Sequence, residues 1–144
     1  MTLTHYSRLG LIVVAVITGA GAIAQAQQNP TSLDNLKRAQ SCEGSIPRFG
    51  FGNPTPPAGT INMNNDGGWC WAQFGYVSGS RYMVPPLQTT QPPQHGTVLT
   101  GGVNDKVRFA YKPFPGFAGN DRFVVHVLGP RQVLDITISV TVTH

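Results

Sequence analysis

The stretch VLDITISVTV, Val133–Val142, decides the fold class of this chain of 144 residues. Apolar and polar residues alternate along it: Leu134, Ile136, Ile138, Val140 and Val142 against Asp135, Thr137, Ser139 and Thr141. This period of two places the apolar set on one face of a β-strand. A strand with one buried face and one wet face is typical of an antiparallel sheet in a β-sandwich.

Two hairpins are expected in the C-terminal half. The first joins GTVLTG, Gly96–Gly101, to KVRFAY, Lys106–Tyr111, across the turn GGVND. The second joins RFVVHV, Arg122–Val127, to the terminal strand across the turn LGPR. The alternation predicts inward-facing and outward-facing side chains in both hairpins. The inward set is Val107, Phe109, Tyr111, Phe123, Val125 and Val127, and the outward set includes Arg108 and Lys112.

Shorter strands are expected before these hairpins. TINM, Thr60–Met63, leads through the turn residues NNDGG into WCWAQFGYV, Trp69–Val77, which we expect to be its return strand. RYMV, Arg81–Val84, forms a short strand that the proline-rich run Pro85–Gln94 interrupts. In the return strand, alternation again separates two faces: Cys70, Ala72, Phe74 and Tyr76 inward, and Trp69, Trp71 and Gln73 outward.

The composition agrees with short strands joined by tight turns. The chain has 17 glycines and 12 prolines, and only 11% of its residues are charged. Together with the strand pattern this predicts an all-β fold, an immunoglobulin-like antiparallel β-sandwich of about seven or eight strands. The net charge of +4 is spread along the chain. Scattered basic residues do not indicate a nucleic-acid partner.

The N-terminus has the pattern of an export signal. Arg8 precedes the apolar run Leu9–Ala24, and the tripeptide AQA, Ala24–Ala26, has small residues where signal peptidase requires them. The competing interpretation is a membrane anchor, but a spanning helix needs about 20 apolar residues, and this run is shorter. We therefore expect a signal peptide at residues 1–26, a polar tail or linker at 27–40 and the domain at 41–144. The mature chain would be periplasmic or secreted and have no membrane span.

The segment Pro92–Val127 resembles the immunoglobulin-like and cadherin-like repeat modules of bacterial surface and secreted proteins. Their shared pattern is matched at eleven positions: Pro93, Gly96, Thr97, Val98, Tyr111, Pro113, Gly116, Phe117, Gly119, Asp121 and Phe123. The resemblance implies a single immunoglobulin-like module. Such repeats often begin with an acidic run that binds calcium, whereas this chain has only NNDGG around Asp66. Calcium binding is therefore not expected.

The loop YKPFPGFAGNDRF, Tyr111–Phe123, is predicted to be structural. Tyr111 and Phe123 lie at the ends of strands with inward faces, so the loop must cross an open end of the sandwich. Phe117 can close that end, since a buried aromatic side chain covers on the order of 150 to 250 Å². Gly116 and Gly119 allow sharp turns, and Asp121 can accept local amide hydrogen bonds. A ligand-binding role for this loop is the alternative.

Cys42 and Cys70, the only two cysteines, are predicted to form a disulfide, the usual state of a cysteine pair in an exported protein. His95, His126 and His144 lack metal-ligand spacing, and no nucleophile elbow, paired-acid constellation or phosphate loop is present. We therefore expect no metal site, no cofactor and no enzymatic activity.

The chain is expected to be a structural or interaction module of the bacterial cell envelope, with an unidentified envelope protein or a polysaccharide as its partner. One alternative is a carbohydrate-binding module in which Trp69 and Trp71, beside Tyr82, form an exposed platform. The same rings could instead pack beneath the proline-rich loop Gly52–Gly59. A further alternative is a chagasin-like inhibitor of cysteine proteases, from faint matches at three short motifs: Asn53–Thr55, Thr100–Gly102 and Tyr111–Phe114.

Overall fold

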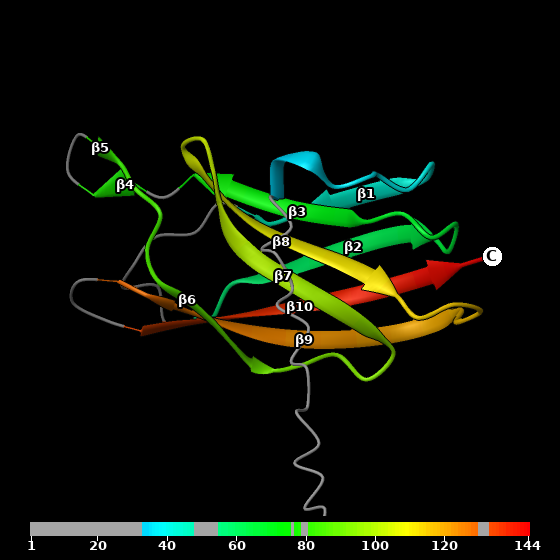
Figure 1. Ribbon diagram of the computed structural model, residues 1–144. Helices are drawn as coiled ribbons and strands as arrows, with labels where there is room; N and C mark the ends of the chain where they lie inside the picture. The colour runs from blue at the N-terminus through cyan, green and yellow to red at the C-terminus, as the bar shows by residue number, and fades with distance from the viewer. Residues whose placement is uncertain (1–32, 48–54, 76, 79–80, 130–132) are drawn as a thin grey trace, which may run out of the picture.

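The computed structural model describes residues 33–47, 55–75, 77–78, 81–129 and 133–144, and the main elements form two facing sheets (Figure 1). The first sheet has the order β1 (Cys42–Ser45), β2 (Ala58–Asn64), β10 (Val133–Thr143), β9 (Gly119–Leu128) and β6 (Leu87–Gln91). The second has the order β3 (Cys70–Gly75), β8 (Lys106–Pro113) and β7 (Gly96–Val103). The small strands β4 (Val77–Ser78) and β5 (Arg81–Tyr82) pair with each other. The predicted all-β sandwich is confirmed.

The core lies between the two sheets and contains the residues that alternation placed inward. Phe109 and Tyr111 of β8 and Phe123, Val125 and Val127 of β9 are completely buried. The rings of Tyr111 and Phe123 lie parallel across the core with centroids 6.3 Å apart. Along β10, the four apolar residues from the second onward are all buried: Ile136, Ile138, Val140 and Val142. The predicted inward faces of the two C-terminal hairpins are confirmed.

One side of the sandwich is closed where β1 meets β3. The predicted disulfide between Cys42 and Cys70 is present and links these two edge strands, with a Cα–Cα distance of 5.2 Å. Gly44 allows their backbones to approach closely, because a Cβ atom at this position would lie 2.0 Å from the carbonyl oxygen of Trp71. The disulfide therefore joins the two sheets to each other.

The expected hairpin of Thr60–Met63 with Trp69–Val77 is wrong. β2 lies in the five-stranded sheet, where it pairs in parallel with β10, and β3 lies in the opposite sheet beside β8. The turn between them crosses from sheet to sheet and is held by Asp66, which accepts hydrogen bonds from the amides of Gln40 (2.7 Å) and Gly68 (2.9 Å). The alternation of apolar and polar residues shows which side chains point inward. It does not show which strands pair, because strands that pair and strands in opposite sheets have the same alternation.

The proline-rich run Pro85–Gln94 also contains an element that was not predicted. Leu87–Gln91 forms β6, which pairs with β9 at the edge of the five-stranded sheet. The prolines flank this strand, so none of them interrupts its hydrogen bonds. The residues between the prolines of a proline-rich run can therefore form a strand.

Residues 33–40, which were expected to belong to a tail or linker, pack against the three-stranded sheet at Gly101 and beside Trp69. This segment begins with the 3₁₀ turn η1 (Leu33–Asn35), and Leu36 and Ala39 after it are buried. The Arg108 side chain donates a hydrogen bond to the Leu33 carbonyl (2.6 Å), and the Ala39 amide donates to the Trp69 carbonyl (2.9 Å). We call residues 33–40 the cover segment. Residues 1–26, the predicted signal peptide, lie outside the described part of the chain.

Among the described residues, no helix has the length and apolar character needed to cross a membrane.

Candidate functional site

The connection between β8 and β9 closes one end of the sandwich through Phe117. This side chain is half-buried against the core, and its ring stacks on His95 with centroids 4.4 Å apart. The Asn65 side-chain amide holds the connection by donating to the carbonyls of Phe114 (2.8 Å) and Phe117 (2.9 Å). Phe117 therefore lies at the open end of the sandwich that it was predicted to close, although it is less completely buried than the core residues.

The other residues predicted for this loop have conformations or positions that suit a structural role. Gly116 and Gly119 have φ angles of 79° and 138°, which side chains with a Cβ rarely adopt. Pro113 is buried at the end of β8. Tyr111 and Phe123, which flank the loop, lie in the core.

Asp121 fixes this end of the fold through four hydrogen bonds. Its carboxylate accepts from the amides of Gln94 (3.0 Å), His95 (2.8 Å) and Arg122 (2.8 Å), and from the buried Tyr111 hydroxyl (3.0 Å). Local amide donors were expected for Asp121, but two of these amides, those of Gln94 and His95, belong to the distant β6–β7 connection. Asp121 thus joins that connection to β9 and to the core.

The carboxylate and the phenol shift each other's acidity. Partial burial alone would raise the pKa of Asp121, but the amides of Gln94, His95 and Arg122 and the Tyr111 hydroxyl bring it below its ordinary value. Burial raises the pKa of Tyr111, and the neighbouring carboxylate of Asp121 raises it further. At neutral pH the pair therefore consists of a carboxylate acceptor and a neutral hydroxyl donor.

Trp69 and Trp71 point outward on the three-stranded sheet, yet both are only partly exposed. The Arg38 and Arg108 guanidinium carbons lie 5.1 and 4.5 Å from the centre of the Trp71 ring. The Lys112 ammonium lies 5.9 Å from the centre of the Trp69 ring. Such cation–π contacts place the protein's own charges over the ring faces on which a sugar would stack.

The cover segment lies beside these tryptophans. Trp69 donates its backbone amide to the Lys37 carbonyl (2.8 Å), and Arg38 comes from the same segment. Residues Gly52–Pro54 of the loop, like the side chain of Tyr82, lie outside the described part of the chain. The structure therefore brings the two indoles together on one face, as predicted, but beneath cationic side chains.

These contacts predict the fluorescence of the chain, whose only two tryptophans are Trp69 and Trp71. We expect emission at shorter wavelength than that of free tryptophan, and no shift on titration with neutral polysaccharides. Trp71→Ala should lower the free energy of unfolding by about 2 kcal/mol, less than the 3 to 5 kcal/mol typical of a fully buried aromatic ring. Chemical denaturation would measure the loss. Emission at long wavelength that shifts with an added glycan would contradict this arrangement.

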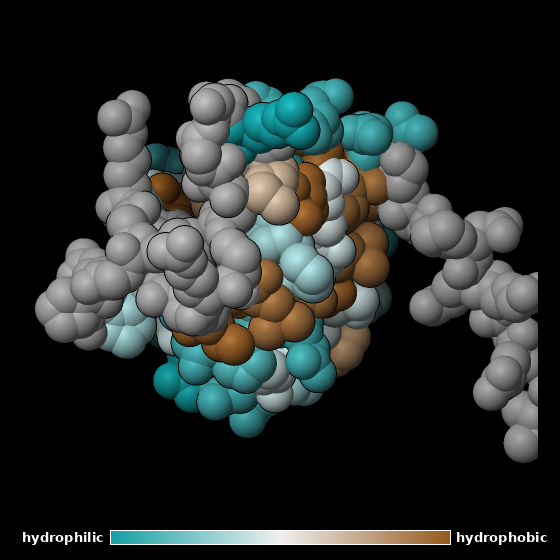
Figure 2. Space-filling model, turned by 90° about the vertical axis from the view of Figure 1, so that its left-hand side faces the viewer, coloured by the Kyte–Doolittle hydropathy of each residue, from teal (hydrophilic) through white to brown (hydrophobic). Residues whose placement is uncertain are grey.

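Four large apolar side chains are exposed in the segment after β5 and where β9 and β10 pair at their ends. Figure 2 views this end of the sandwich and shows apolar surface on it. The exposed fractions of the four side chains are 44% for Met83, 39% for Val84, 38% for Leu128 and 57% for Val133. Leu128 and Val133 pair directly across β9 and β10. We call these four residues the apolar end.

A backbone hydrogen bond and a close side-chain contact join the apolar end to the strands. The Leu128 amide donates to the Pro86 carbonyl (2.9 Å), which ties β9 to the segment that follows Val84. Val84 in turn lies so close to β7 that a Cβ atom on Gly102 would come within 2.5 Å of its side chain. The Leu128–Pro86 contact therefore joins segments that are 42 positions apart in the sequence.

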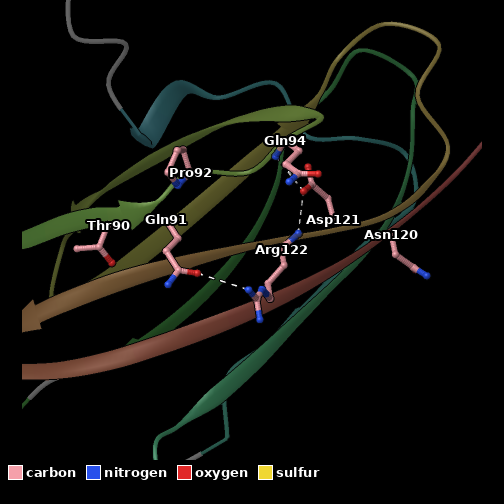
Figure 3. A pocket seen from close by; sticks show the side chains of 7 residues that line it. All are labelled: Thr90, Gln91, Pro92, Gln94, Asn120, Asp121 and Arg122. Atoms are coloured by element: carbon pink, nitrogen blue, oxygen red, sulfur yellow. Dashed lines mark hydrogen bonds between the residues drawn. The ribbon is translucent and has the colours of Figure 1, made fainter.

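A polar pocket of about 570 Å³ lies towards the other end of β9 (Figure 3). Gln91 of β6 and Arg122 of β9 reach towards each other, and Gln94 lies on the wall that Asp121 holds in place. The pocket is lined by Thr90, Gln91, Pro92, Gln94, Asn120, Asp121 and Arg122. Only Asp121 among these was predicted as a site residue, because the pocket forms between strands whose pairing was not predicted.

The two cysteine side chains and those of His95 and His126 make contacts within the fold. Both cysteines are in the disulfide, and no group of three or more His, Cys, Asp or Glu side chains among the described residues could hold a metal ion. His126 is partly exposed and hydrogen-bonds to Asp135 on the neighbouring strand. The expectation of a non-catalytic protein stays a prediction.

The motifs that suggested a protease inhibitor do not meet in space. Thr100–Gly102 lies near the end of β7, and Tyr111–Phe114 lies at the end of β8. Since β7 and β8 run antiparallel, these motifs are at opposite ends of one hairpin. Asn53 and Pro54 of the third motif are outside the described residues. This geometry gives no support to a three-loop inhibitory edge.

Comparison of the chain with protein-family models finds no matching family, and comparison with curated proteins finds no match. The resemblance to immunoglobulin-like and cadherin-like modules thus remains a prediction from the sequence.

Proposed function

We propose that this protein is an exported, non-catalytic, immunoglobulin-like interaction module of the bacterial cell envelope, and that it binds another protein through its apolar end. The observation that carries the proposal is the exposure of Met83, Val84, Leu128 and Val133 at one end of the sandwich. Exposed apolar side chains that gather in one place are a feature of protein-binding surfaces.

The chemistry of this surface favours a protein partner over a sugar. Its four side chains are aliphatic or thioether groups, which provide neither the hydrogen bonds that sugar hydroxyls require nor an aromatic face for stacking. Aliphatic groups of a partner protein could cover them and remove apolar area from water. Leu128 and Val133 are held by the β9–β10 ladder, so little ordering would be needed on binding.

The rest of the fold suits a passive module in an oxidising compartment. The Cys42–Cys70 disulfide connects the two sheets, and disulfides persist in the periplasm and outside the cell. The predicted signal peptide supports the same location. The carbohydrate-binding alternative that uses Trp69 and Trp71 is less well supported, because cationic side chains lie over both rings.

Substitutions on strand β10 can test the proposal with a matched control. Val133→Lys places a charge in the apolar end, whereas Thr143→Lys places the same charge on an exposed position farther along the strand. The mature domain would be immobilised, incubated with envelope extract, and its bound proteins quantified by mass spectrometry. We expect a partner that binds the wild type and Thr143→Lys equally and binds Val133→Lys at least about tenfold less. Equal recovery with all three proteins would contradict the proposal.

A further inference from the structure

The polar pocket beside β9 is rich in groups that can bind hydroxyls. Its lining includes the side-chain amides of Gln91, Gln94 and Asn120 and the hydroxyl of Thr90. Each amide offers both donors and an acceptor, so together they can satisfy hydroxyl groups, which also donate and accept. The pocket therefore matches a ligand that carries several hydroxyl groups.

Arg122 is the charged donor of the pocket. Its guanidinium makes one long hydrogen bond, 3.5 Å, to the Gln91 side chain, and no carboxylate forms an ion pair with it in the described part of the chain. The neighbouring Asp121 carboxylate is already engaged by four donors, including the Arg122 backbone amide. Asp121 thus fixes the wall of the pocket, while the Arg122 guanidinium still has N–H groups that can donate to a ligand.

Two rows of exposed polar side chains continue from the pocket across the five-stranded sheet. In the first row, Arg122 of β9 lies opposite Ser139 of β10, which lies opposite Thr60 of β2. The second row runs parallel to it and contains Asn120, Thr141 and Asn62. All six residues are exposed, and neighbouring strands are about 4.8 Å apart. The rows form a polar strip long enough to contact several units of an extended chain.

We propose that the pocket and this strip bind an acidic glycan, a linear polysaccharide whose sugars carry carboxylate groups. The Arg122 guanidinium would bind one carboxylate through two parallel hydrogen bonds, the arrangement that suits this planar fork. The amides of Gln91, Gln94 and Asn120 would bind the hydroxyls of the same sugar. Adjacent sugars would lie along the rows of Ser, Thr and Asn side chains.

Other classes of ligand match this site less well. A polyphosphate chain such as a nucleic acid is bound mainly by several Lys and Arg side chains, and the pocket has one arginine. A protein partner usually buries aromatic or aliphatic anchors in the centre of its interface, and the two rows contain none. The glycan site is also distinct from the apolar end, so the two proposals can fail separately.

The test uses the folded mature protein and a pair of oligosaccharides. One is a short oligogalacturonate, and the other is its fully methyl-esterified form, which keeps the hydroxyls but loses the carboxylate charges. Binding would be followed by the NMR shifts of the backbone and side-chain amides of Gln91, Gln94 and Asn120. We expect the acidic oligosaccharide to shift these signals and its ester to bind at least tenfold more weakly. The affinity should also fall as salt is added.

Two matched substitutions complete the design. Arg122→Gln removes the charge in the pocket and should weaken binding of the acidic oligosaccharide at least tenfold, as loss of a charge-assisted bidentate contact would. Arg81→Gln removes an exposed positive charge from β5, at the other end of the molecule, and should bind like the wild type. Val133→Lys, which is designed to disrupt the apolar end, should also bind the glycan normally.

Three results would overturn the acidic-glycan site. The first is equal affinity for the acid and its methyl ester. The second is equal loss of binding in Arg122→Gln and Arg81→Gln, which would indicate a general charge effect. The third is the absence of shifts at Gln91, Gln94 and Asn120, whether or not signals elsewhere move.

Discussion

Asp121→Ala should lower the free energy of unfolding by about 4 kcal/mol. The substitution removes the acceptor of three backbone amides and of the completely buried Tyr111 hydroxyl. Hydrogen bonds to a charged group contribute about 1.5 to 3 kcal/mol each, and a buried hydroxyl left without a partner costs about 1 to 3 kcal/mol. Because the bonds are lost together and water can replace some of them, the total is smaller than their sum.

Equilibrium denaturation would measure this effect, with Tyr111→Phe as the control. That substitution removes only the hydroxyl and leaves Asp121 with its three amide donors, so we expect it to cost about 1 kcal/mol. If Asp121→Ala were no more destabilising than Tyr111→Phe, the carboxylate would not join the β6–β7 connection to β9.

The same carboxylate predicts how stability depends on pH. The folded-state pKa of Asp121 lies below its ordinary value, as does that of Asp66, where the amides of Gln40 and Gly68 are the main cause. A lowered pKa stabilises the fold above the unfolded-state pKa of about 3.9, and this stabilisation is lost as the pH falls through the lower folded-state value. Asp121→Asn should therefore make the acid side of the stability profile less steep.

Loss of the disulfide should lower the free energy of unfolding by about 3.5 kcal/mol. Cys42 and Cys70 are 28 positions apart, and closure of a loop of this length constrains the unfolded chain by about that amount. The bond also holds the short edge strand β1 against β3 in the other sheet. A double Cys42→Ala and Cys70→Ala variant would be compared with the wild type by urea denaturation.

Reduction of the wild type provides an independent comparison. Dithiothreitol breaks the same bond without removing either sulfur atom, so the reduced protein and the double variant should lose similar stability. Hydrogen exchange should accelerate first in β1, which is four residues long and lies at the sheet edge. An unchanged unfolding midpoint in protein whose two thiols can be labelled would show that the bond contributes nothing to stability.

Much of the fold could be predicted because side chains on a strand alternate between buried and exposed, and this alternation is visible in the sequence of each strand. The alternation in Val133–Val142 and Arg122–Val127 correctly identified the inward faces of β10 and β9, and the cysteine pair correctly gave the disulfide. Pairing between distant strands could not be obtained in this way. The parallel pairing of β2 with β10 depends on how both sheets assemble, and no local pattern in Thr60–Met63 specifies it.

The candidate surfaces were predicted less well for the same reason. The cover segment had one signal in its sequence, the spacing of Leu33, Leu36 and Ala39 by three within a polar stretch. The apolar end has no such signal, because its residues come from Met83–Val84 and from the β9–β10 pair, which are joined only after the strands are in place. Arg122 likewise has no signal in the sequence, where it is one of several scattered basic residues. Its pocket forms only because β6 pairs with β9.

Site-specific photo-crosslinking in living bacteria tests the central proposal most directly. A photoreactive amino acid would replace Val133 in the apolar end or, as the control, Thr143 on the same strand, and both proteins would be exported at equal levels. The proposal predicts a discrete crosslinked product with one envelope protein from position 133 and none of that product from position 143. A product of twice the chain's mass would instead identify a second copy of this protein as the partner. Equal crosslinking from both positions, or none from position 133, would contradict a protein-binding role for the apolar end.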